Sequence, residues 1–466
     1  MALAAHLLLA VGVSGHIVLT KPDVRAAIGW VGLVWLTPVL GSVLYLFLGI
    51  NRIRRRAGRI RRGRVTGPRS VPDPAILQDV PEALRPLATL VGAVTGASVV
   101  PGNSVEPLVN GDAAFPAMLV AIDGASTSIA FATYIFDRGH VADQFVAAFE
   151  RAVQRGVTVR VLIDGVGARY SRPPIAPLLR KRGVTVAEFR PSTFPVAHPF
   201  FNLRNHRKLL VVDGVHGFCG GINIRDGCLL AVNPRNPTQD IHFSLRGPVV
   251  RQMMSAFAFD WQFTTAEALD GDAWSANPAP GAQGSVFARG IADGPDEDFE
   301  ALLLTLLGAL ATATRSVRIV TPYFLPDPPL LDALKVAALR GVRVQIVLPE
   351  RTNLPLVQWA QAAHLADVLM GGARLFLTPA PFDHSKLVVV DGAWSLIGSA
   401  NWDPRSLRLN FEYVVECYST ELAATLGGII DTKCAAAKEL TIADLNRRPL
   451  AVKLRDGAAW LMQPYL

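Results

Sequence analysis

The chain has 466 residues, of which 50% are hydrophobic and 18% are charged. This length excludes a small disulfide-stapled scaffold, and the mean hydropathy of +0.31 excludes a disordered chain and exceeds what a wholly soluble enzyme needs. The 46 lysines and arginines outnumber the 38 acidic residues and give a net charge of +8.

Two apolar runs open the chain, Ala2 to Leu19 and Ala26 to Ile50. The second carries no formal charge over its whole length. At a rise of ~1.5 Å per residue it exceeds the ~30 Å hydrocarbon core of a bilayer. Eight arginines follow between Arg52 and Arg64, so the positive-inside rule places everything after residue 51 in the cytoplasm. The sequence therefore predicts a two-helix transmembrane hairpin over residues 1–65, with a cleaved signal peptide as the alternative for residues 1–20.

The excess of basic charge is concentrated in residues 52–64. Without these eight arginines, 38 basic residues balance 38 acidic ones. A nucleic-acid partner is therefore not expected, because nucleic-acid binding requires basic charge over a folded face. The arginine block either binds anionic headgroups at the membrane surface or serves only as a topology signal.

Two stretches rich in proline, glycine and small residues are interpreted as linkers, residues 66–74 and residues 272–284. The predicted parts are the hairpin with its arginine-rich segment (1–65), a linker with a pre-domain helix (66–105), a first globular half (106–271) and a second half with the C-terminal tail (285–466).

The tail mixes basic residues with Trp460 and Met462. It either rests on a membrane surface or packs on the globular core.

The two globular halves share an order of elements: a strand, a loop with an aromatic pair, an amphipathic helix, the residues Arg-Gly-Val, and a second apolar strand. Helical spacing relates Phe145 to Phe149 and Leu331 to Leu334. Strand–helix–strand units favour a largely parallel sheet covered by helices, and their repetition indicates a duplication with a pseudo-two-fold arrangement. The aromatic pairs, for which core packing is expected and a place in the site is the alternative, are Tyr134/Phe136 and Tyr323/Phe324.

One pattern of polar residues occurs in each half, as NHRKLLVVDGVHGFCGGIN and as DHSKLVVVDGAWSLIGSAN. Both copies fit H-x-K-x4-D-x6-G-[GS]-x-N, and every motif position in the second copy follows its counterpart in the first by the same offset. The members able to carry chemistry are His206, Lys208, Asp213 and Asn223 in the first copy and His384, Lys386, Asp391 and Asn401 in the second.

A histidine and a lysine two residues apart on a strand point to the same face of a sheet. The pseudo-dyad would bring two imidazoles and two ammonium groups around one small cavity, which suits a phosphodiester. One neutral imidazole attacks phosphorus and forms a phosphohistidine, while the other protonates the leaving alkoxide and then deprotonates the incoming alcohol. Both lysines, with Asn223 and Asn401, are expected to donate to the non-bridging oxygens. This chemistry requires neither a metal nor a cofactor.

The duplicated motif resembles the phospholipase D superfamily over roughly residues 100–440. The apolar hairpin, the arginine block and the phrases NHRK, GGIN and NWDPRSLRLNFE narrow the resemblance to the bacterial cardiolipin synthases. The resemblance implies an α/β fold in which two similar α/β/α sandwich halves form a pseudo-two-fold catalytic unit, preceded by the transmembrane hairpin. It also implies a phosphatidyltransferase of phospholipid biosynthesis, multi-pass in the bacterial inner membrane, with the catalytic domain in the cytoplasm.

Two pairs of carboxylates are expected to have different roles, one pair in turns and the other next to the histidines. The family signature includes Asp213 and Asp391 in the catalytic site. However, each lies five positions after its lysine, on the opposite strand face, and is followed by glycine, so a structural role in a hairpin turn is expected. By resemblance, the carboxylates that orient the histidines would be Asp240, counted forward from His206, and Glu412, counted forward from His384.

By the same resemblance, His206 attacks one phosphatidylglycerol and releases glycerol, and a second phosphatidylglycerol resolves the intermediate to give cardiolipin. The symmetry of the motif does not distinguish His206 from His384 as the nucleophile. A hydrolytic phospholipase D and a membrane-tethered phosphodiesterase or nuclease are alternatives within the superfamily. A catalytically dead lipid-binding scaffold is the alternative outside it, although both motif copies are intact. The acceptor lipid and a homo-oligomeric state stay open.

Overall fold

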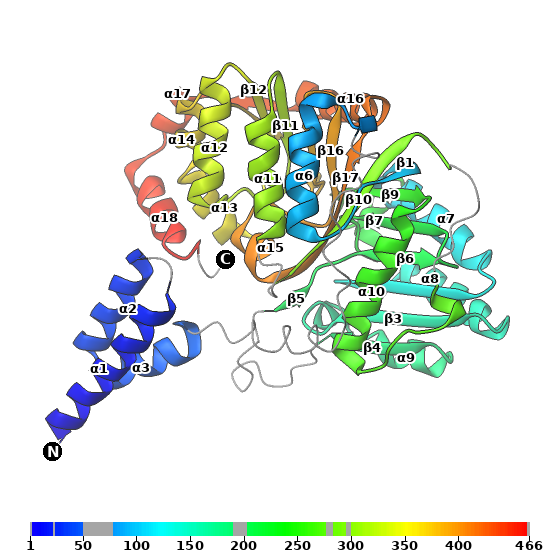
Figure 1. The fold of residues 1–466 in the computed structure, drawn as a ribbon, viewed down its shortest axis with the longest axis horizontal. Coiled ribbons are helices and arrows are strands. Elements are labelled where there is room, and N and C mark those ends of the chain that lie inside the picture. Colours follow the sequence, from blue (N-terminus) through cyan, green and yellow to red (C-terminus); the bar gives the residue numbers. More distant parts are fainter. Residues whose placement is uncertain are drawn as a thin grey trace. The chain divides into compact units, whose positions relative to one another are not determined.

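The computed structural model describes residues 2–21, 24–49, 78–189, 203–275, 283–294 and 300–463 (Figure 1). The arginine block at 52–64, the predicted linker at 66–74 and the stretch 276–282 of the second predicted linker lie outside these ranges. The chain divides into a small N-terminal unit that ends at Gly63 and a larger unit that contains both halves.

The N-terminal unit consists of short helices. They are α1 (Ala2–Thr20), α2 (Val24–Leu36) and α3 (Pro38–Leu44), followed by one π-helical turn (Tyr45–Gly49). Pro38 lies in the first turn of α3, where its missing N–H leaves no bond unmade, so the predicted second run is two helices rather than one. Among the described residues, none of the helices combines the length and the apolarity that crossing a bilayer requires.

Among the described residues, one sheet runs through both halves of the larger unit, and fifteen of its strands follow one another in a single spatial order. The first half contributes β4 (Thr185–Phe189), β3 (Thr158–Asp164), β2 (Ser128–Thr133), β6 (Leu209–Val212), β7 (His216–Gly220), β9 (Ile241–Arg246) and β1 (Val100–Val109), in this spatial order. The second half contributes β10 (Val286–Asp293), β17 (Asn410–Tyr418), β16 (Trp394–Gly398), β15 (Leu387–Val390), β11 (Ser316–Val320), β12 (Arg343–Pro349), β13 (Arg374–Thr378) and β18 (Lys438–Leu440). The strands β1 and β10 pair at the centre of the sheet. Outward from this pair, equivalent strands of the two halves follow in the same order, as a pseudo-two-fold predicts.

The sheet is mixed, so the prediction of a largely parallel sheet is wrong. Parallel ladders join β2 to β3 and β4, and β11 to β12 and β13. The motif strands form antiparallel hairpins, β6 with β7 and β15 with β16. The cause is the Asp-Gly turn, in which Asp213 (φ 51°) and Gly214 (φ 65°) both have positive φ, as the tight hairpin turn of two antiparallel strands requires.

Helices pack against the strands of the sheet and against one another. In the first half they are α7 (Asn110–Asp123), α8 (His140–Gln154), α9 (Ala176–Lys181) and α10 (Val249–Thr265). In the second half they are α11 (Ala301–Thr312), α12 (Pro328–Leu339), α13 (Pro355–Ala362), α14 (Leu365–Met370), α15 (Pro404–Arg408), α16 (Thr420–Ala436), α17 (Ile442–Asn446) and α18 (Leu450–Trp460). The predicted helical faces are buried: Phe145 and Phe149 in the core of the first half, Leu331 and Leu334 in that of the second.

The described part of the segment expected to link the hairpin to the first half, residues 78–105, contains a helix and the start of a strand. Its helix α6 (Arg85–Thr95) packs against α11 of the second half, as the ribbon also shows (Figure 1). The strand β1 begins at Val100, within the predicted linker, and is the central strand that pairs with β9 and β10. This strand therefore spans position 106, the predicted start of the first half.

Two short strands cross from one half to the other. The strand β5 (Arg204–Asn205) pairs in parallel with β17 of the second half. Its counterpart β14 (Phe382–Asp383) pairs in parallel with β8 (Thr238–Gln239) of the first half. Each crossing strand directly precedes a motif histidine, so these pairings decide what the histidines contact.

Candidate active site

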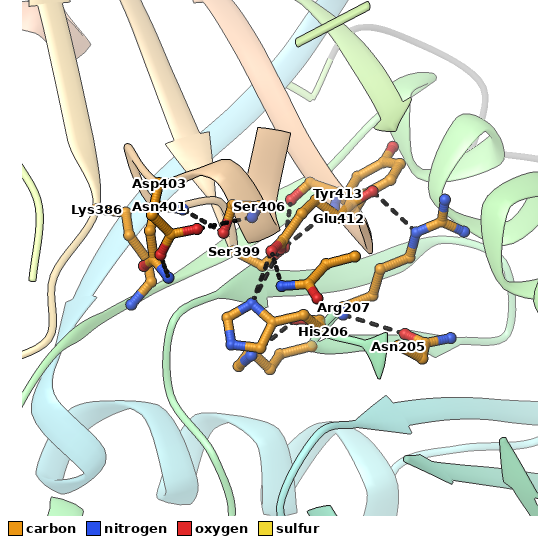
Figure 2. A network of polar contacts seen from close by, with 12 residues as sticks. Asn205, His206, Arg207, Lys386, Ser399, Asn401, Asp403, Ser406, Glu412 and Tyr413 are labelled. Atoms are coloured by element: carbon orange, nitrogen blue, oxygen red, sulfur yellow. Dashed lines mark hydrogen bonds and ion pairs between the residues drawn. The ribbon is translucent and has the colours of Figure 1, made fainter. Parts of the chain in front are cut away.

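The first motif histidine lies beside a carboxylate of the second half. His206 follows β5, and its backbone N–H donates to the carbonyl of Phe411 at 2.9 Å. Its Nδ1 lies 2.9 and 3.0 Å from the two carboxylate oxygens of Glu412 (Figure 2). Both side chains are buried, so the carboxylate holds the imidazole with Nδ1 toward β17.

The second motif histidine has the mirrored arrangement. The backbone N–H of His384 donates to the carbonyl of Gln239 at 2.7 Å, and its Nδ1 lies 2.7 Å from Oδ2 of Asp240. Asp240 and Glu412, both named from the sequence, therefore contact motif histidines, but each contacts the histidine of the other half. The sequence paired each carboxylate with the histidine of its own half. This pairing is wrong because β5 and β14, which precede the histidines, each pair with a strand of the other half.

The two carboxylates are held differently, which explains why one motif position is glycine in the first copy and serine in the second. Ser399 donates from Oγ to Oε2 of Glu412 at 2.5 Å, and it accepts the backbone N–H of Tyr413 at 3.0 Å. In the first copy this position is Gly221, where a Cβ would come within 2.3 Å of Oδ1 of Asp240. In the observed position of Asp240, a side chain at position 221 would meet its carboxylate, whereas Glu412 accepts a hydrogen bond from the serine at the equivalent position.

Both motif lysines precede their strands rather than lying within them. Lys208 donates from Nζ to the carbonyl of His206 at 2.7 Å and lies 5.5 Å from the ring centre of Tyr134. Lys386 makes closer contact with its histidine: its Nζ lies 2.8 Å from Nδ1 and 3.2 Å from Nε2 of His384. The two halves are thus not equivalent, since an ammonium group contacts only one of the two imidazole rings within the described part of the chain.

Burial dominates the electrostatics of the site. It lowers the pKa of His384 to about 4, and the positive charge of Lys386 adds to the effect against the opposing Asp240. It likewise lowers the pKa of His206, with Glu412 opposing. Burial also lowers the pKa of Lys208 to about 7. Both imidazoles are consequently neutral near pH 7, and Lys208 changes charge close to it.

The two carboxylates that contact the histidines have lowered pKa values despite their burial. Burial alone would raise the pKa of Asp240, but Lys386 and His384 bring it below the ordinary value. For Glu412, burial is likewise outweighed, chiefly by His206, and the pKa is lowered. Each histidine therefore has an ionised carboxylate beside its Nδ1, and Nε2 is the nitrogen that the carboxylate does not contact. In His384 this nitrogen lies 3.2 Å from Nζ of Lys386.

The two motif asparagines are buried next to these groups. Asn223 accepts the backbone N–H of Ile135 at Oδ1 over 3.1 Å. Asn401 donates from Nδ2 to Asp403 at 3.2 Å, and its Oδ1 is buried without a partner among the described residues (Figure 2).

The two motif aspartates bind backbone N–H groups rather than the motif histidines or lysines in the described part of the chain, and their place in the catalytic group stays a prediction. Asp213 accepts the backbone N–H groups of Ser126, Thr127 and Ser128 at 2.8 to 2.9 Å, which holds the loop before β2. Asp391 accepts the equivalent N–H groups before β11, from residues 314 to 316. Burial would raise the pKa of Asp213, but these donors lower it. The contacts match the turn-holding role expected from strand parity.

Comparison with known proteins agrees with the motif. A family described as cardiolipin synthase, PLD-like domain, matches residues 118–257 and 306–432, one segment in each half. The chain belongs to this cardiolipin synthase family. The major cardiolipin synthase ClsA of Bacillus subtilis is 30% identical to it over 96% of this chain and 95% of its own length. A cardiolipin synthase of Geobacillus kaustophilus is 30% identical over 94% of this chain and 88% of its own. The predicted family and enzyme class, a phosphatidyltransferase of the phospholipase D type, are confirmed.

A solved structure shares the fold of this cardiolipin synthase family member. The phosphatidylserine synthase of Haemophilus influenzae superposes with a TM-score of 0.61 at 16% identity, and the match covers 78% of this chain and 95% of that one. At this identity the likeness shows the fold alone. It supports the two-half α/β architecture predicted from the repeat.

Several buried groups of the site were not predicted. Arg207 donates to Asp260 at 2.6 Å, to the carbonyl of Glu412 at 2.9 Å and to the carbonyl of Asp293 at 3.1 Å. Asp260 also accepts from Asn205 at 2.8 Å. This network ties the first motif to β17 and β10 of the second half. One indication of this network was present in the sequence, which is that Asn205 and Arg207 directly flank His206.

The aromatic pairs divide between the site and the cores. Tyr134 meets His206 edge to face, with ring centres 5.2 Å apart, and Tyr323 meets His384 at 6.1 Å. Phe136 packs in the core of the first half, and Phe324 does so in the second. The expectation of core packing therefore holds for the phenylalanines, while both tyrosines belong to the site.

Proposed function

We propose that this enzyme uses phosphatidylglycerol as both donor and acceptor, and produces cardiolipin and glycerol through a phosphatidyl-histidine. The observation that carries the proposal is the crossed pairing of two buried histidines with two buried carboxylates. Lys386 lowers the pKa of His206 and Lys208 lowers that of His384, so the four groups act on one another across the halves.

In the first step, Nε2 of His206 attacks the phosphorus of one phosphatidylglycerol. The bond from phosphorus to the headgroup glycerol breaks, and the glycerol oxygen takes a proton from His384. We choose His206 because, among the described residues, no ammonium group contacts its ring, whereas Lys386 contacts both nitrogens of His384. An anionic phosphodiester beside Lys208 and Lys386 offsets their positive charge, which raises the pKa of His384 and enables it to carry that proton.

In the second step, a hydroxyl of another phosphatidylglycerol attacks the phosphorus of the intermediate. His384, now neutral, takes the hydroxyl proton, and the bond between phosphorus and Nε2 of His206 breaks. Cardiolipin leaves, and both histidines return to their starting states. The lysines, with Asn223 and Asn401, stabilise the charge on the non-bridging oxygens in both steps. No metal or cofactor takes part.

The membrane assignment belongs to this proposal. Its substrates are bilayer lipids, and residues 1–65 form the hairpin and arginine segment that keep the catalytic halves on the cytoplasmic face of the inner membrane. The block from Arg52 to Arg64 binds anionic headgroups there. The parts 66–105, 106–271 and 285–466 serve as the connecting segment and the two catalytic halves. Removing residues 1–65 should turn a protein that only detergent extracts from the membrane into one that alkaline carbonate or high salt releases, and a truncated protein that still requires detergent would contradict this topology.

The decisive experiment supplies phosphatidylglycerol as the only lipid and identifies products by mass spectrometry. Cardiolipin and glycerol are expected. Phosphatidic acid and glycerol would instead identify a hydrolytic phospholipase D with the same two histidines. His206→Ala and His384→Ala are the controls, and each should abolish turnover while the protein keeps its wild-type circular dichroism.

A further inference from the structure

The last helix carries its apolar residues on the outside. Leu450, Leu454 and Leu461 of the α18 region are 72%, 66% and 70% exposed. At spacings of four and seven positions they share one side of the helix, which we call the α18 stripe. The opposite side packs inward, where Asp456 and Ala459 are buried. Single exposed leucines are ordinary on proteins, but a row of three on one helical side marks an interaction surface.

The charges around the stripe are positive. Between residues 447 and 463 the chain has four basic residues and one acidic residue, Asp456. That aspartate is buried and bound to Arg448 at 2.8 Å and Arg455 at 2.7 Å. Lys453 and Arg455 are exposed on either side of the stripe. An apolar helical side flanked by cations matches an anionic bilayer surface, where leucines enter the acyl boundary and cations meet headgroup phosphates.

The surface is connected to the site through one layer of side chains. Helix α18 packs on α13, and Ala459 joins a small apolar cluster with Tyr323, Leu325 and Ala360. Tyr323 in turn meets the ring of His384, as described above. Figure 1 shows α18 and α13 next to each other in the second half. The α18 surface therefore lies close to the second motif, separated from His384 by these packed side chains.

We propose that the α18 stripe, with its flanking cations, docks the catalytic unit on an anionic bilayer beside the site. This inference rests on the proposed function, because it assigns the surface from which phosphatidylglycerol reaches the histidines. The sequence left two alternatives for the C-terminal tail, contact with a membrane surface and packing on the globular core, and in this proposal both apply. The inner side of α18 packs on the second half, and the outer side contacts lipid.

A fluorescence measurement tests the contact directly. The full chain, with the half-buried Cys434 replaced by alanine, receives one cysteine labelled with an environment-sensitive dye, through Leu454→Cys or Val120→Cys. Val120 on α7 of the first half is 73% exposed and serves as the matched control. Vesicles of phosphatidylglycerol and phosphatidylcholine should shift the emission of the dye at position 454 to shorter wavelength, and leave the dye at position 120 unchanged. No shift at 454, or a dye that is already shielded before vesicles are added because another part of the chain covers it, would overturn the proposal.

A kinetic measurement separates this inference from the function on which it rests. The double variant Leu450→Asp/Leu454→Asp should raise KM for phosphatidylglycerol in vesicles by roughly tenfold or more, because charged side chains no longer enter the lipid. Turnover of monomeric dihexanoyl-phosphatidylglycerol should stay at the wild-type level, and Val120→Asp should change neither. Equal turnover of vesicles by the variant and the wild type would refute the docking surface. Failure of the wild type to make cardiolipin from either substrate would refute the proposed function instead.

Discussion

Replacing each orienting carboxylate by its amide tests the crossed pairing of the histidines. The carboxylate of Glu412 is fully buried and accepts from His206 Nδ1 at 2.9 Å, Ser399 Oγ at 2.5 Å and Asn410 Nδ2 at 3.2 Å. A glutamine amide has one acceptor oxygen, so at least one donor loses its partner and the imidazole loses the charge that orients it. Loss of such a carboxylate slows a histidine-dependent step by about 10²- to 10⁴-fold, which is about 3–5 kcal/mol at the transition state.

The assay uses two substrates that differ in the leaving group. Phosphatidylglycerol needs an acid to protonate its leaving glycerol, whereas the nitrophenyl ester of phosphatidic acid releases a stable phenolate without one. Glu412→Gln should slow the first turnover of both substrates, because Glu412 orients the nucleophile His206. Asp240→Asn should slow phosphatidylglycerol but leave the nitrophenolate burst near the wild-type rate, because Asp240 orients the acid His384. The reverse pattern would show either that each carboxylate serves the histidine of its own half or that His384 is the nucleophile, and either result would refute the reasoning.

The pH profile, the turn aspartate and metal removal provide three further tests. With a monomeric phosphatidylglycerol, kcat/KM should fall as pH rises through about 7, because Lys208 then loses its proton. It should continue to rise as pH falls from 7 toward 5, because the free enzyme must take up a proton on His384, whose pKa is about 4, before that histidine can protonate the leaving glycerol. A kcat/KM that is constant from pH 5 to pH 9 would contradict both parts. Asp213→Ala should lower the free energy of unfolding by about 1–3 kcal/mol in a denaturant titration, because three backbone N–H groups lose their acceptor, while kcat/KM changes only a few-fold. A loss of activity comparable to that of His206→Ala would instead place the aspartate in the chemistry. Turnover should be unchanged in EDTA, since the two-histidine mechanism uses no metal, and a loss that added metal restores would disprove that mechanism.

The sequence alone was sufficient for the repeat and its local elements. The constant offset between the two motif copies identified two halves, and apolar spacing located helices such as α8 and α12. Strand parity and the following glycine identified Asp213 and Asp391 as turn residues. These inferences succeeded because they depend on neighbours within about ten positions, where backbone geometry relates sequence spacing directly to direction.

The partners of the histidines were decided only by the tertiary structure. His206 meets a carboxylate 206 positions away, and His384 meets one 144 positions away. In a duplicated chain, the same motifs are compatible with pairing within each half or across the halves, because local spacing is identical in both cases. The choice is made where β5 pairs with β17 and β14 with β8, through backbone hydrogen bonds between halves. The same long-range packing buries the lysines and imidazoles together and so sets their pKa values, which no local pattern of residues encodes.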